Sequence, residues 1–502
     1  MRFNRTSLIV WTASLALSAG VLTACNTTSA NGTSATASAD SGKIPLTTKS
    51  EEARKEFLQG QDLADRLQGQ ESLQHFDKAL ALDPEFASAE LARANVSPTA
   101  KEFFDHLKNA VNLEDKASTG EKLVIQANEA GTNGDAAKQK EYLDKLVAAY
   151  PNDERAHFAV GNYAFGQQDL GEAIEQFTKT AELAPNFSPV YNILGYAYRQ
   201  QGNFAGAEQS FRKYIELIPN DPNPYDSYAE LLLKEGKFDE SIAQYRKALS
   251  VDPHFAASHF GISADLMYLG KGQAANAELQ SLADQARNDG ELRTALFGMA
   301  VVASDSGKFA QALQAMDKEF AVAQKKNDVA SMAADLQAKG NILAEVPKYD
   351  EAKQQFDRSL ELIQGSNLSQ EIKDNATRLH HFNLAALAIG GRDLAGAKSH
   401  AEEFRQSAEL TKNPVQIRFV HELAGRIALA EKDYDKAIAE LQQANHLDPR
   451  NLYRIALAYQ GKGNSTEAHD WLTQAAAFNS LPQLPYAFIR VKAQKMAAST
   501  KG

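Results

Sequence analysis

Apolar residues recur along most of the chain at spacings of three and four positions, which is the period of an amphipathic helix and not of a strand. Segments that end in Pro185, Pro219 and Pro253 align with a spacing of 34 residues, and the aligned columns carry matching residue types. A unit of this length holds two helices. The pattern therefore predicts a repeating series of helical hairpins, strongest over residues 154–290.

One unit shows the order of residue types clearly. Large, small, aromatic and proline positions follow one another in it as Tyr191, Leu194, Gly195, Tyr198, Ala207, Phe211, Tyr214 and Pro219. The next unit repeats this order with Tyr225, Tyr228, Ala229, Leu232, Ser241, Tyr245, Ala248 and Pro253. The order resembles the tetratricopeptide repeat, with a departure at Tyr214, where a small residue is usual. The resemblance implies an all-α, tetratricopeptide-type α-solenoid, that is, a superhelical stack of antiparallel helix hairpins.

Helix geometry explains why such a sequence repeats. Large residues three and four positions apart form an apolar stripe on each helix, and small residues let two helices approach closely. Gly202-Asn203 and Gly236-Lys237 supply turns, and Asp252-Pro253 ends a helix because proline cannot continue it. Each hairpin leaves an apolar face exposed until a neighbour covers it, so the hairpins are expected to stack.

Weaker units fill the rest of the folded part. The expected segments are degenerate hairpins over 51–153, well-patterned repeats over 154–290, further repeats over 291–484, and a capping helix with a tail over 485–502. The clearest marks of the weaker units are Gly60, Phe76, Ala79 and Pro84; Gly161, Ala173, Phe177 and Pro185; Gly340, Leu343, Ala352 and Phe356; and Gly425, Ala437, Leu441 and Pro449.

Two local features refine this division. Ser118 to Glu121 has the residue types of a capping box, which opens a helix by satisfying its first backbone N–H groups. In the capping helix, Arg490, Lys492 and Lys495 are expected to face water. A terminal helix of this kind would shield the apolar face of the last hairpin.

The N-terminus has the form of an export signal. Arg2 and Arg5 precede an apolar stretch, residues 8–22, that is too short for a comfortable membrane span. The stretch ends in Leu22-Thr23-Ala24-Cys25, which resembles the lipobox of bacterial lipoproteins. The resemblance implies a signal peptide over 1–24 and acyl groups on Cys25 that anchor the protein to a membrane. The alternative is an ordinary cysteine.

The residues after Cys25 bear on where the anchor lies. In lipoproteins an Asp at the next position retains the protein at the inner membrane, and this protein has Asn26. Anchoring at the outer membrane, facing the periplasm, is therefore favoured, with the inner membrane or the cell surface as alternatives. Residues 25–50 are rich in Ser, Thr, Ala and Gly, so we expect them to form a lipidated, disordered tether.

Charge and thiol content exclude some classes of function. The formal net charge is −11, which repels a phosphate backbone, so nucleic acid is not an expected partner. Cys25 is the single cysteine of the sequence, which leaves no internal disulfide and no cysteine-based metal site. Stability is therefore expected to come from packing.

No motif predicts catalysis. His421 begins a sequence like that of zinc proteases, but Gly425 stands where the second histidine is needed. The pair His380-His381, and likewise His254 and His259, lack the spacing that aims two ligands at one metal. We nominate no catalytic residue, no metal site and no cofactor, and we expect that the protein is not an enzyme.

The resemblance also implies where a partner would bind, because in tetratricopeptide repeats the first helices of successive hairpins line the concave surface. The candidate residues of a peptide-binding groove are Phe158, Asn162, Phe165, Asn192, Tyr196, Arg199, Asp226, Glu230, Leu233, Phe260, Met267 and Tyr268. Aromatic rings with a few polar groups suit an extended peptide or a helix of apolar or mixed-charge character. The alternative for each residue is packing between neighbouring repeats.

These features favour a membrane-anchored scaffold that binds protein or peptide clients in bacterial envelope assembly or secretion. Two alternatives stay open at this point. One is a ligand-binding receptor or an enzyme hidden in a divergent region such as 97–150 or 322–347. The other is a self-associating structural protein whose arrays stack end to end.

Overall fold

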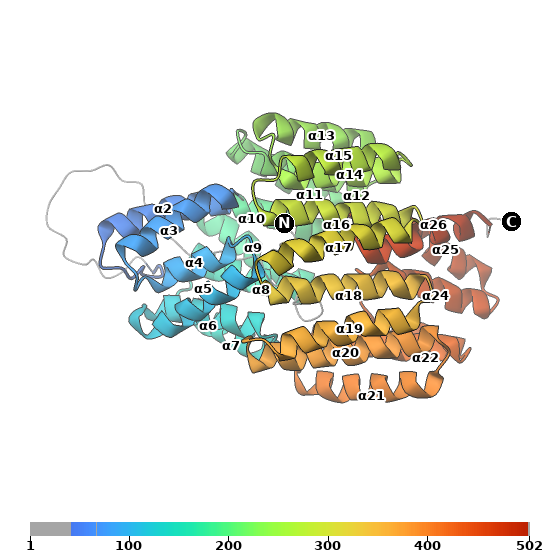
Figure 1. Ribbon diagram of the computed structural model, residues 1–502. Helices are drawn as coiled ribbons and strands as arrows, with labels where there is room; N and C mark the ends of the chain where they lie inside the picture. The colour runs from blue at the N-terminus through green and yellow to red at the C-terminus, as the bar shows by residue number, and fades with distance from the viewer. Residues whose placement is uncertain (1–41, 67, 500–502) are drawn as a thin grey trace. The chain divides into compact units, whose positions relative to one another are not determined.

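The computed structural model describes residues 42–66 and 68–499, and these residues form α-helices joined by short turns (Figure 1). They contain 25 α-helices, one 3-10 helix and no β-strand, so the prediction of an all-α fold is confirmed. The helices are α2 (Glu51–Asp65), α3 (Gly69–Leu82), α4 (Ala87–Asn95), α5 (Ala100–Leu113), η1 (Glu114–Lys116), α6 (Thr119–Thr132), α7 (Ala136–Ala149), α8 (Glu154–Gly166), α9 (Leu170–Leu183), α10 (Ser188–Gln201), α11 (Phe204–Leu217), α12 (Asn223–Lys234), α13 (Phe238–Val251), α14 (Ala256–Tyr268), α15 (Gly272–Asp284), α16 (Asp289–Asp305), α17 (Phe309–Lys325), α18 (Val329–Glu345), α19 (Tyr349–Gln364), α20 (Gln370–Gly390), α21 (Leu394–Leu410), α22 (Pro414–Ala430), α23 (Tyr434–Leu441), α24 (Pro449–Gly461), α25 (Ser465–Ala476) and α26 (Leu484–Ser499). The signal peptide and Cys25 lie outside the described residues.

The described residues divide into two compact units, one of residues 42–98 and 102–219 and one of residues 99–101 and 220–499. In the first unit α2 packs on α3, α6 on α7, α8 on α9, and α10 on α11. In the second unit α12 packs on α13, and the same pairing continues to α24 and α25. The second helix of a hairpin also contacts the first helix of the next, as α9 contacts α10 and α13 contacts α14. Within each unit the hairpins therefore stack in sequence order.

Close helix packing in the hairpins rests on glycines that face large side chains sixteen positions later. A Cβ atom built on Gly195 would lie 2.5 Å from a ring carbon of Phe211, and one on Gly161 would lie 2.6 Å from Phe177. Gly60 faces Phe76 and Gly340 faces Phe356 in the same way. The rings of Phe211 and Phe177 are fully buried. The small and the large position of each repeat therefore contact each other between the two helices of a hairpin. This confirms the prediction that small residues let the helices approach closely.

The predicted helix boundaries also have the expected local chemistry. Gly202 and Gly236 have φ values of +85° and +78°, which suit glycine because it lacks a Cβ. The hydroxyl of Ser118 accepts a hydrogen bond from the backbone N–H of Glu121, and the Glu121 carboxylate accepts one from the backbone N–H of Ser118, so the capping box is confirmed. Helix α13 ends at Val251, directly before Asp252-Pro253.

Residues 42–50 correct one expectation, namely that they belong to a disordered tether. They lie as an extended segment against the first unit, where the backbone N–H of Ile44 donates to Asp153 at 2.9 Å. The N–H of Thr47 donates to Glu121 at 3.0 Å, and the hydroxyl of Thr48 donates to Asp83 at 2.6 Å. Ile44 is buried as well. The composition of the segment does not reveal these anchors, because they are bonds to acids distant in the sequence.

The final helix, α26, begins close to the predicted position near residue 485, but its surroundings differ from those of a simple cap. It contacts α25, and it also contacts the first helices α16, α18 and α24 of three hairpins. The prediction that Arg490 faces water is wrong, because Arg490 is buried and forms two hydrogen bonds, of 2.6 and 2.5 Å, to Asp305. Lys492 and Lys495 are exposed. A buried guanidinium is tolerated here because a carboxylate faces it directly.

Candidate peptide-binding faces

In the first unit, the candidate groove residues lie on α8 and α10, the first helices of two successive hairpins. Asn162 on α8 is buried, and neither its side-chain oxygen nor its nitrogen has a hydrogen-bond partner. The side-chain oxygen of Asn192 on α10 is buried and has no partner either. A buried amide without a partner is costly, so water or a ligand is needed to satisfy it. The Asn162 amide and the Asn192 side-chain oxygen are therefore available to bond such a water or ligand.

The aromatic residues of the same face pack closely within their hairpins. Phe158 is buried, with its ring centroid 5.7 Å from that of Phe177 and 5.2 Å from that of Phe187. Tyr196 is buried against Phe211 at 5.3 Å, and the guanidinium of Arg199 lies over the Tyr196 ring at 4.7 Å. These contacts hold the rings rigid. Phe165 is buried too, so packing accounts for most of these side chains.

In the second unit, several candidate residues serve hairpin packing. Asp226 on α12 accepts a hydrogen bond of 2.7 Å from Ser258 on α14, which joins two successive first helices. Leu233 is part of an apolar cluster with Tyr245 and Phe255. Glu230 is buried, with 5% of its surface exposed. This part of the predicted groove is therefore mostly interior.

The remaining candidates, Phe260, Met267 and Tyr268, are covered by residues 477–499, which we call the C-terminal segment. Tyr268 donates a hydrogen bond to the carbonyl of Ser480, and its ring lies 5.7 Å from that of Tyr486. Phe260 and Met267 belong to an apolar cluster that includes several residues of α26. The first-helix face of α14 and α16 is thus occupied by the protein's own C-terminal segment.

The C-terminal segment reaches further first helices. Lys234 of α12 donates to the carbonyl of Phe478 and lies over its ring at 4.2 Å. Tyr453 of α24 donates to the sulfur of Met496 at 3.0 Å. Sequence reasoning missed this arrangement, although apolar residues at consecutive positions of α26, Phe488 and Ile489 among them, indicate a helix buried on more than one side.

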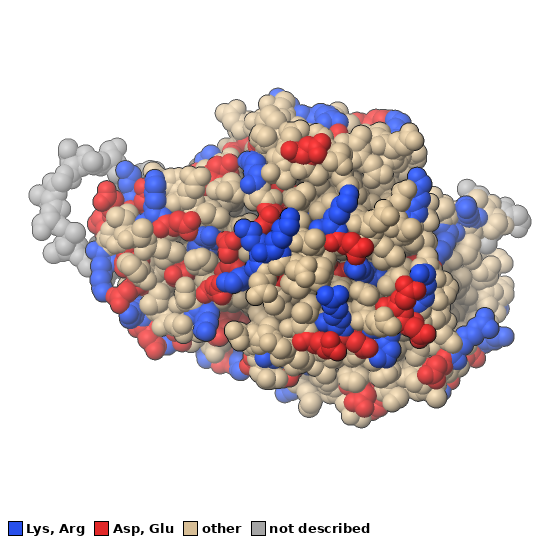
Figure 2. Space-filling model, viewed as in Figure 1, with Lys and Arg blue, Asp and Glu red and all other residues tan. Residues whose placement is uncertain are grey.

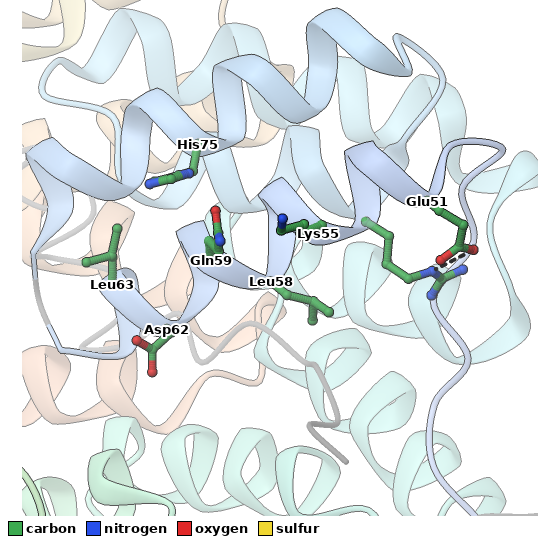
Figure 3. A pocket seen from close by; sticks show the side chains of 8 residues that line it. Glu51, Lys55, Leu58, Gln59, Asp62, Leu63 and His75 are labelled. Carbon is green, nitrogen blue, oxygen red and sulfur yellow. Dashed lines mark ion pairs between the residues drawn. The ribbon is translucent and has the colours of Figure 1, made fainter. Parts of the chain in front are cut away.

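A depression of about 640 Å³ lies along α2 and α3 in the first unit (Figure 3). Its lining mixes an Arg54–Glu51 ion pair of 3.4 Å with the apolar side chains of Leu58 and Leu63. His75 lines it from α3. Sequence reasoning did not find this place. Its mixed lining suits a peptide side chain rather than an enclosed small molecule.

In five hairpins a histidine faces a side chain nineteen positions away on the other helix of the hairpin, and in four of them this histidine lies on the first helix. Sequence reasoning missed this register, because it considered the histidines only as metal ligands. The partner is an acid in three hairpins, an amide in one and a second histidine in one. The pairs are His75–Glu56, which runs in the reverse direction, His157–Gln176, His259–Glu278, His381–His400 and His421–Glu440.

Other candidate chemistry can be assessed on the described residues. They hold no group of three or more His, Cys, Asp or Glu side chains placed to bind a metal ion. None of their helices has the length and apolar character needed to cross a membrane. On the face drawn in Figure 2, acidic and basic side chains are interspersed. The divergent region 97–150 forms α5, η1, α6 and α7, and the region 322–347 contains the end of α17 and α18.

Solved structures of similar helical proteins cover large parts of the sequence. A PilF structure from Pseudomonas aeruginosa is 20% identical, covers 44% of this chain and 90% of that one, and has a TM-score of 0.30. A tetratricopeptide repeat protein from Parabacteroides merdae is 15% identical, with 62% and 99% covered and a TM-score of 0.33. The Cut9–Hcn1 assembly of the APC/C is 14% identical, with 90% and 76% covered and a TM-score of 0.39. Likenesses at these scores carry no argument about function.

Family models identify part of the sequence directly. Tetratricopeptide repeat models match residues 126–188, 188–221, 223–255 and 420–451. No curated protein matches the sequence. The matched segments coincide with hairpins from α6 to α13 and from α22 to α23. The protein therefore carries tetratricopeptide repeats, set in an all-α solenoid of stacked hairpins.

Proposed function

We propose that this protein is a membrane-anchored scaffold that binds an extended segment of a client protein on the first-helix face of α8 and α10. Tetratricopeptide repeats are protein-interaction modules, so a protein partner is the coarse expectation. The observation that supports this particular face is the buried amide of Asn162, in which neither atom has a partner, together with the buried side-chain oxygen of Asn192, which has none either. Amide side chains both donate to and accept from a peptide backbone, which has both groups at every residue.

The same unit offers rigid surroundings for such a segment. Tyr196 is fixed between Phe211 and Arg199. Because these side chains are already ordered, binding a client costs little of their conformational entropy. In the second unit, by contrast, the C-terminal segment already occupies the corresponding helices. We therefore assign client binding to the first unit.

The binding test uses a doubly substituted variant, Asn162→Ala with Asn192→Ala, in the full-length protein. Clients are captured from detergent-solubilised envelopes, and affinity is then measured for the client found. We expect about thirtyfold weaker binding, because the two lost hydrogen bonds are worth roughly 1 kcal/mol each. Asn128→Ala is the matched control, since the Asn128 amide on α6 already donates to the carbonyl of Val124. Equal affinity of wild type and double variant would refute this face.

The anchoring part of the proposal rests on Leu22-Thr23-Ala24-Cys25, followed by Asn26, and it extends to an outer-membrane position facing the periplasm. Cys25→Ser removes the one thiol of the protein and hence the attachment point for acyl groups. We expect wild type in the membrane fraction, with a mass increase on its N-terminal peptide, and the variant without either property. Wild-type protein that lacks the added mass would refute lipidation, and density separation of the two membranes would test the location.

A further inference from the structure

The histidine pair between α20 and α21 differs from the other four pairs of its register in the distance between the facing atoms. In those four pairs, a ring nitrogen of the histidine lies 2.5 to 2.8 Å from an acid or amide oxygen, which is the range of a hydrogen bond. The Nδ1 atoms of His381 and His400 face each other at 3.3 Å. This separation is longer than that of a normal hydrogen bond from an N–H group.

The separation matches that of two ligands on one tetrahedral metal ion. Zn²⁺ holds imidazole nitrogens at about 2.0–2.1 Å, which places two of them about 3.3–3.4 Å apart. Square-planar and octahedral ions bring neighbouring ligand nitrogens closer together, to about 2.8–3.0 Å. The ring centroids of His381 and His400 lie 5.6 Å apart, so the two Nδ1 atoms lie on the near edges of the rings.

The adjacent His380 faces a different helix and is not a third ligand. Its Nε2 atom lies 3.4 Å from a carboxylate oxygen of Asp357 on α19, and its ring centroid lies 6.4 Å from that of His381. Since the described residues hold no group of three or more potential ligands, the protein supplies two ligands here. Water would take the other positions of a tetrahedral ion, which makes the site an open one.

The charges around the histidine pair favour a cation. Asp393, the N-cap of α21, and Glu403, one turn after His400, both act electrostatically on His400. Lys353 of α19 also acts on His400, but it is paired with Asp357 at 2.7 Å, so this ion pair adds no net charge. The two remaining acids complement the charge of a divalent cation.

The pair is both accessible and rigidly held. His381 and His400 are half-buried rather than enclosed, and Glu403 on the next turn of α21 is exposed, so an ion can reach the pair from solvent. Helix α20 packs on α21, and the buried rings of Phe382 and Phe404 lie 5.6 Å apart between them. Ligands on packed helices keep their separation, which favours metal binding.

We propose that His381 and His400 bind one Zn²⁺ ion through their Nδ1 atoms, with water completing the coordination. The ion joins α20 to α21, and it stabilises this hairpin because the two nitrogens face each other only in the folded protein. The proposal is independent of client binding, since the site lies in the second unit and involves neither Asn162 nor Asn192.

The test uses the full-length protein in detergent, purified without a histidine tag and carrying Cys25→Ser, which removes the single thiol as a competing ligand. Zn²⁺ binding is measured by calorimetry, and Co²⁺ is the spectroscopic probe because its tetrahedral complexes absorb visible light far more strongly than its octahedral ones. Mg²⁺ is the negative probe, since it prefers oxygen ligands. We expect one Zn²⁺ per chain, intense Co²⁺ absorption and no binding of Mg²⁺. Zn²⁺ should also slow hydrogen exchange of the α20 and α21 amides.

Substitutions at the pair make the result specific. His381→Gln and His400→Gln each remove one ligand nitrogen and leave a histidine facing an amide, as in the His157–Gln176 pair. Each should weaken Zn²⁺ binding by at least about tenfold, because even the loss of a group that only supports a metal ligand typically costs roughly 10- to 100-fold. His157→Gln is the matched control, and this variant should bind Zn²⁺ as the parent protein does.

Three outcomes would overturn the proposal. The first is a folded parent protein that does not bind Zn²⁺. The second is unchanged binding by His381→Gln or His400→Gln, which would place the ion elsewhere; if one of these variants does not fold, the other decides. The third is Zn²⁺ binding that slows exchange in other hairpins but not in α20 and α21. None of these outcomes bears on the test of Asn162 and Asn192.

Discussion

Two hairpins of the second unit use one register for different chemistry. In the α14–α15 hairpin His259 faces Glu278 at 2.5 Å, and in the α20–α21 hairpin His381 faces His400 at 3.3 Å. Burial alone would lower the pKa of His259, but hydrogen bonds to Glu278 and to the carbonyl of Pro253 outweigh it and raise the pKa. Burial, followed by the charge of His381, lowers the pKa of His400.

The two pairs therefore depend on pH with opposite sign. The raised pKa of His259 gives stability that is present below the unfolded value of 6.5 and is lost as the pH rises through the folded pKa. The lowered pKa of His400 costs stability as the pH falls below 6.5, because the unfolded protein then binds the proton more readily. One side chain in the repeat decides whether mild acid strengthens or weakens a hairpin.

The largest change in stability is expected at Asp265 on α14. Unlike Glu278, which pairs with His259 and Arg246, Asp265 has no hydrogen-bond partner for its carboxylate. Asp265 is fully buried, and neither carboxylate oxygen has a hydrogen-bond partner. Burial raises its pKa to about 8, and the nearby Ser241, which donates to the carbonyl of Ala229, offsets only part of this. Between the unfolded pKa of 3.8 and the folded pKa, rising pH therefore costs about 1.4 kcal/mol per unit.

Asp265→Asn removes that cost, and we expect the variant to be more stable than wild type by about 4 kcal/mol at pH 7. Urea denaturation at pH 5, 7 and 9 measures the gap, which should widen with pH and level off above about 8, where the folded wild type also ionises. A gap that does not change with pH would show that the Asp265 carboxyl is not protonated in the folded protein.

A smaller effect is expected from breaking the paired hairpin. Glu278→Ala takes from His259 its acid and from Arg246 an ion pair of 2.6 Å. We expect a loss of about 2 kcal/mol at pH 6 and a smaller loss at pH 8, because fewer wild-type molecules carry the proton of His259 at the higher pH. Hydrogen exchange of the α14 and α15 amides measures the loss locally. Equal losses at both pH values would contradict the assigned role of the His259 proton.

The smallest effect converts one hairpin into the other type. His400→Glu places an acid opposite His381 at the register of His259 and Glu278, and we expect a gain of about 1 kcal/mol at pH 5.5. His400→Gln is the control, since it reproduces the His157–Gln176 pair and removes repulsion without adding a charge. Hydrogen exchange of the α20 and α21 amides measures the gain. If His400→Glu is no more stable than His400→Gln at pH 5.5, an acid at this position does not stabilise the hairpin through His381.

Local sequence signals predict most of the fold. Glycine and phenylalanine sixteen positions apart, as in Gly195 and Phe211, mark a helix contact that lies within one hairpin. The capping box at Ser118 and the turn at Gly202 are set by neighbouring residues. Each of these signals can be read within one repeat, which is why one sequence suffices to predict the hairpins.

Contacts between distant segments escape prediction for the opposite reason. The burial of Arg490 depends on Asp305, which lies 185 positions earlier, and no periodicity connects them. The covering of Tyr268 by Ser480 is of the same kind. The sequence therefore places the candidate residues on first helices, while the side chains available to a client cannot be predicted without knowing what covers them.

The extended segment of residues 42–50 has a mechanical consequence. Its hydrogen bonds end on Asp83 after α3, Glu121 of α6 and Asp153 before α8, so it is bonded to three hairpins of the first unit. A pulling force applied at the N-terminus would be divided among these three points instead of peeling α2 from its neighbour. Tension on the N-terminal side of this segment would then enter the first unit at several hairpins at once.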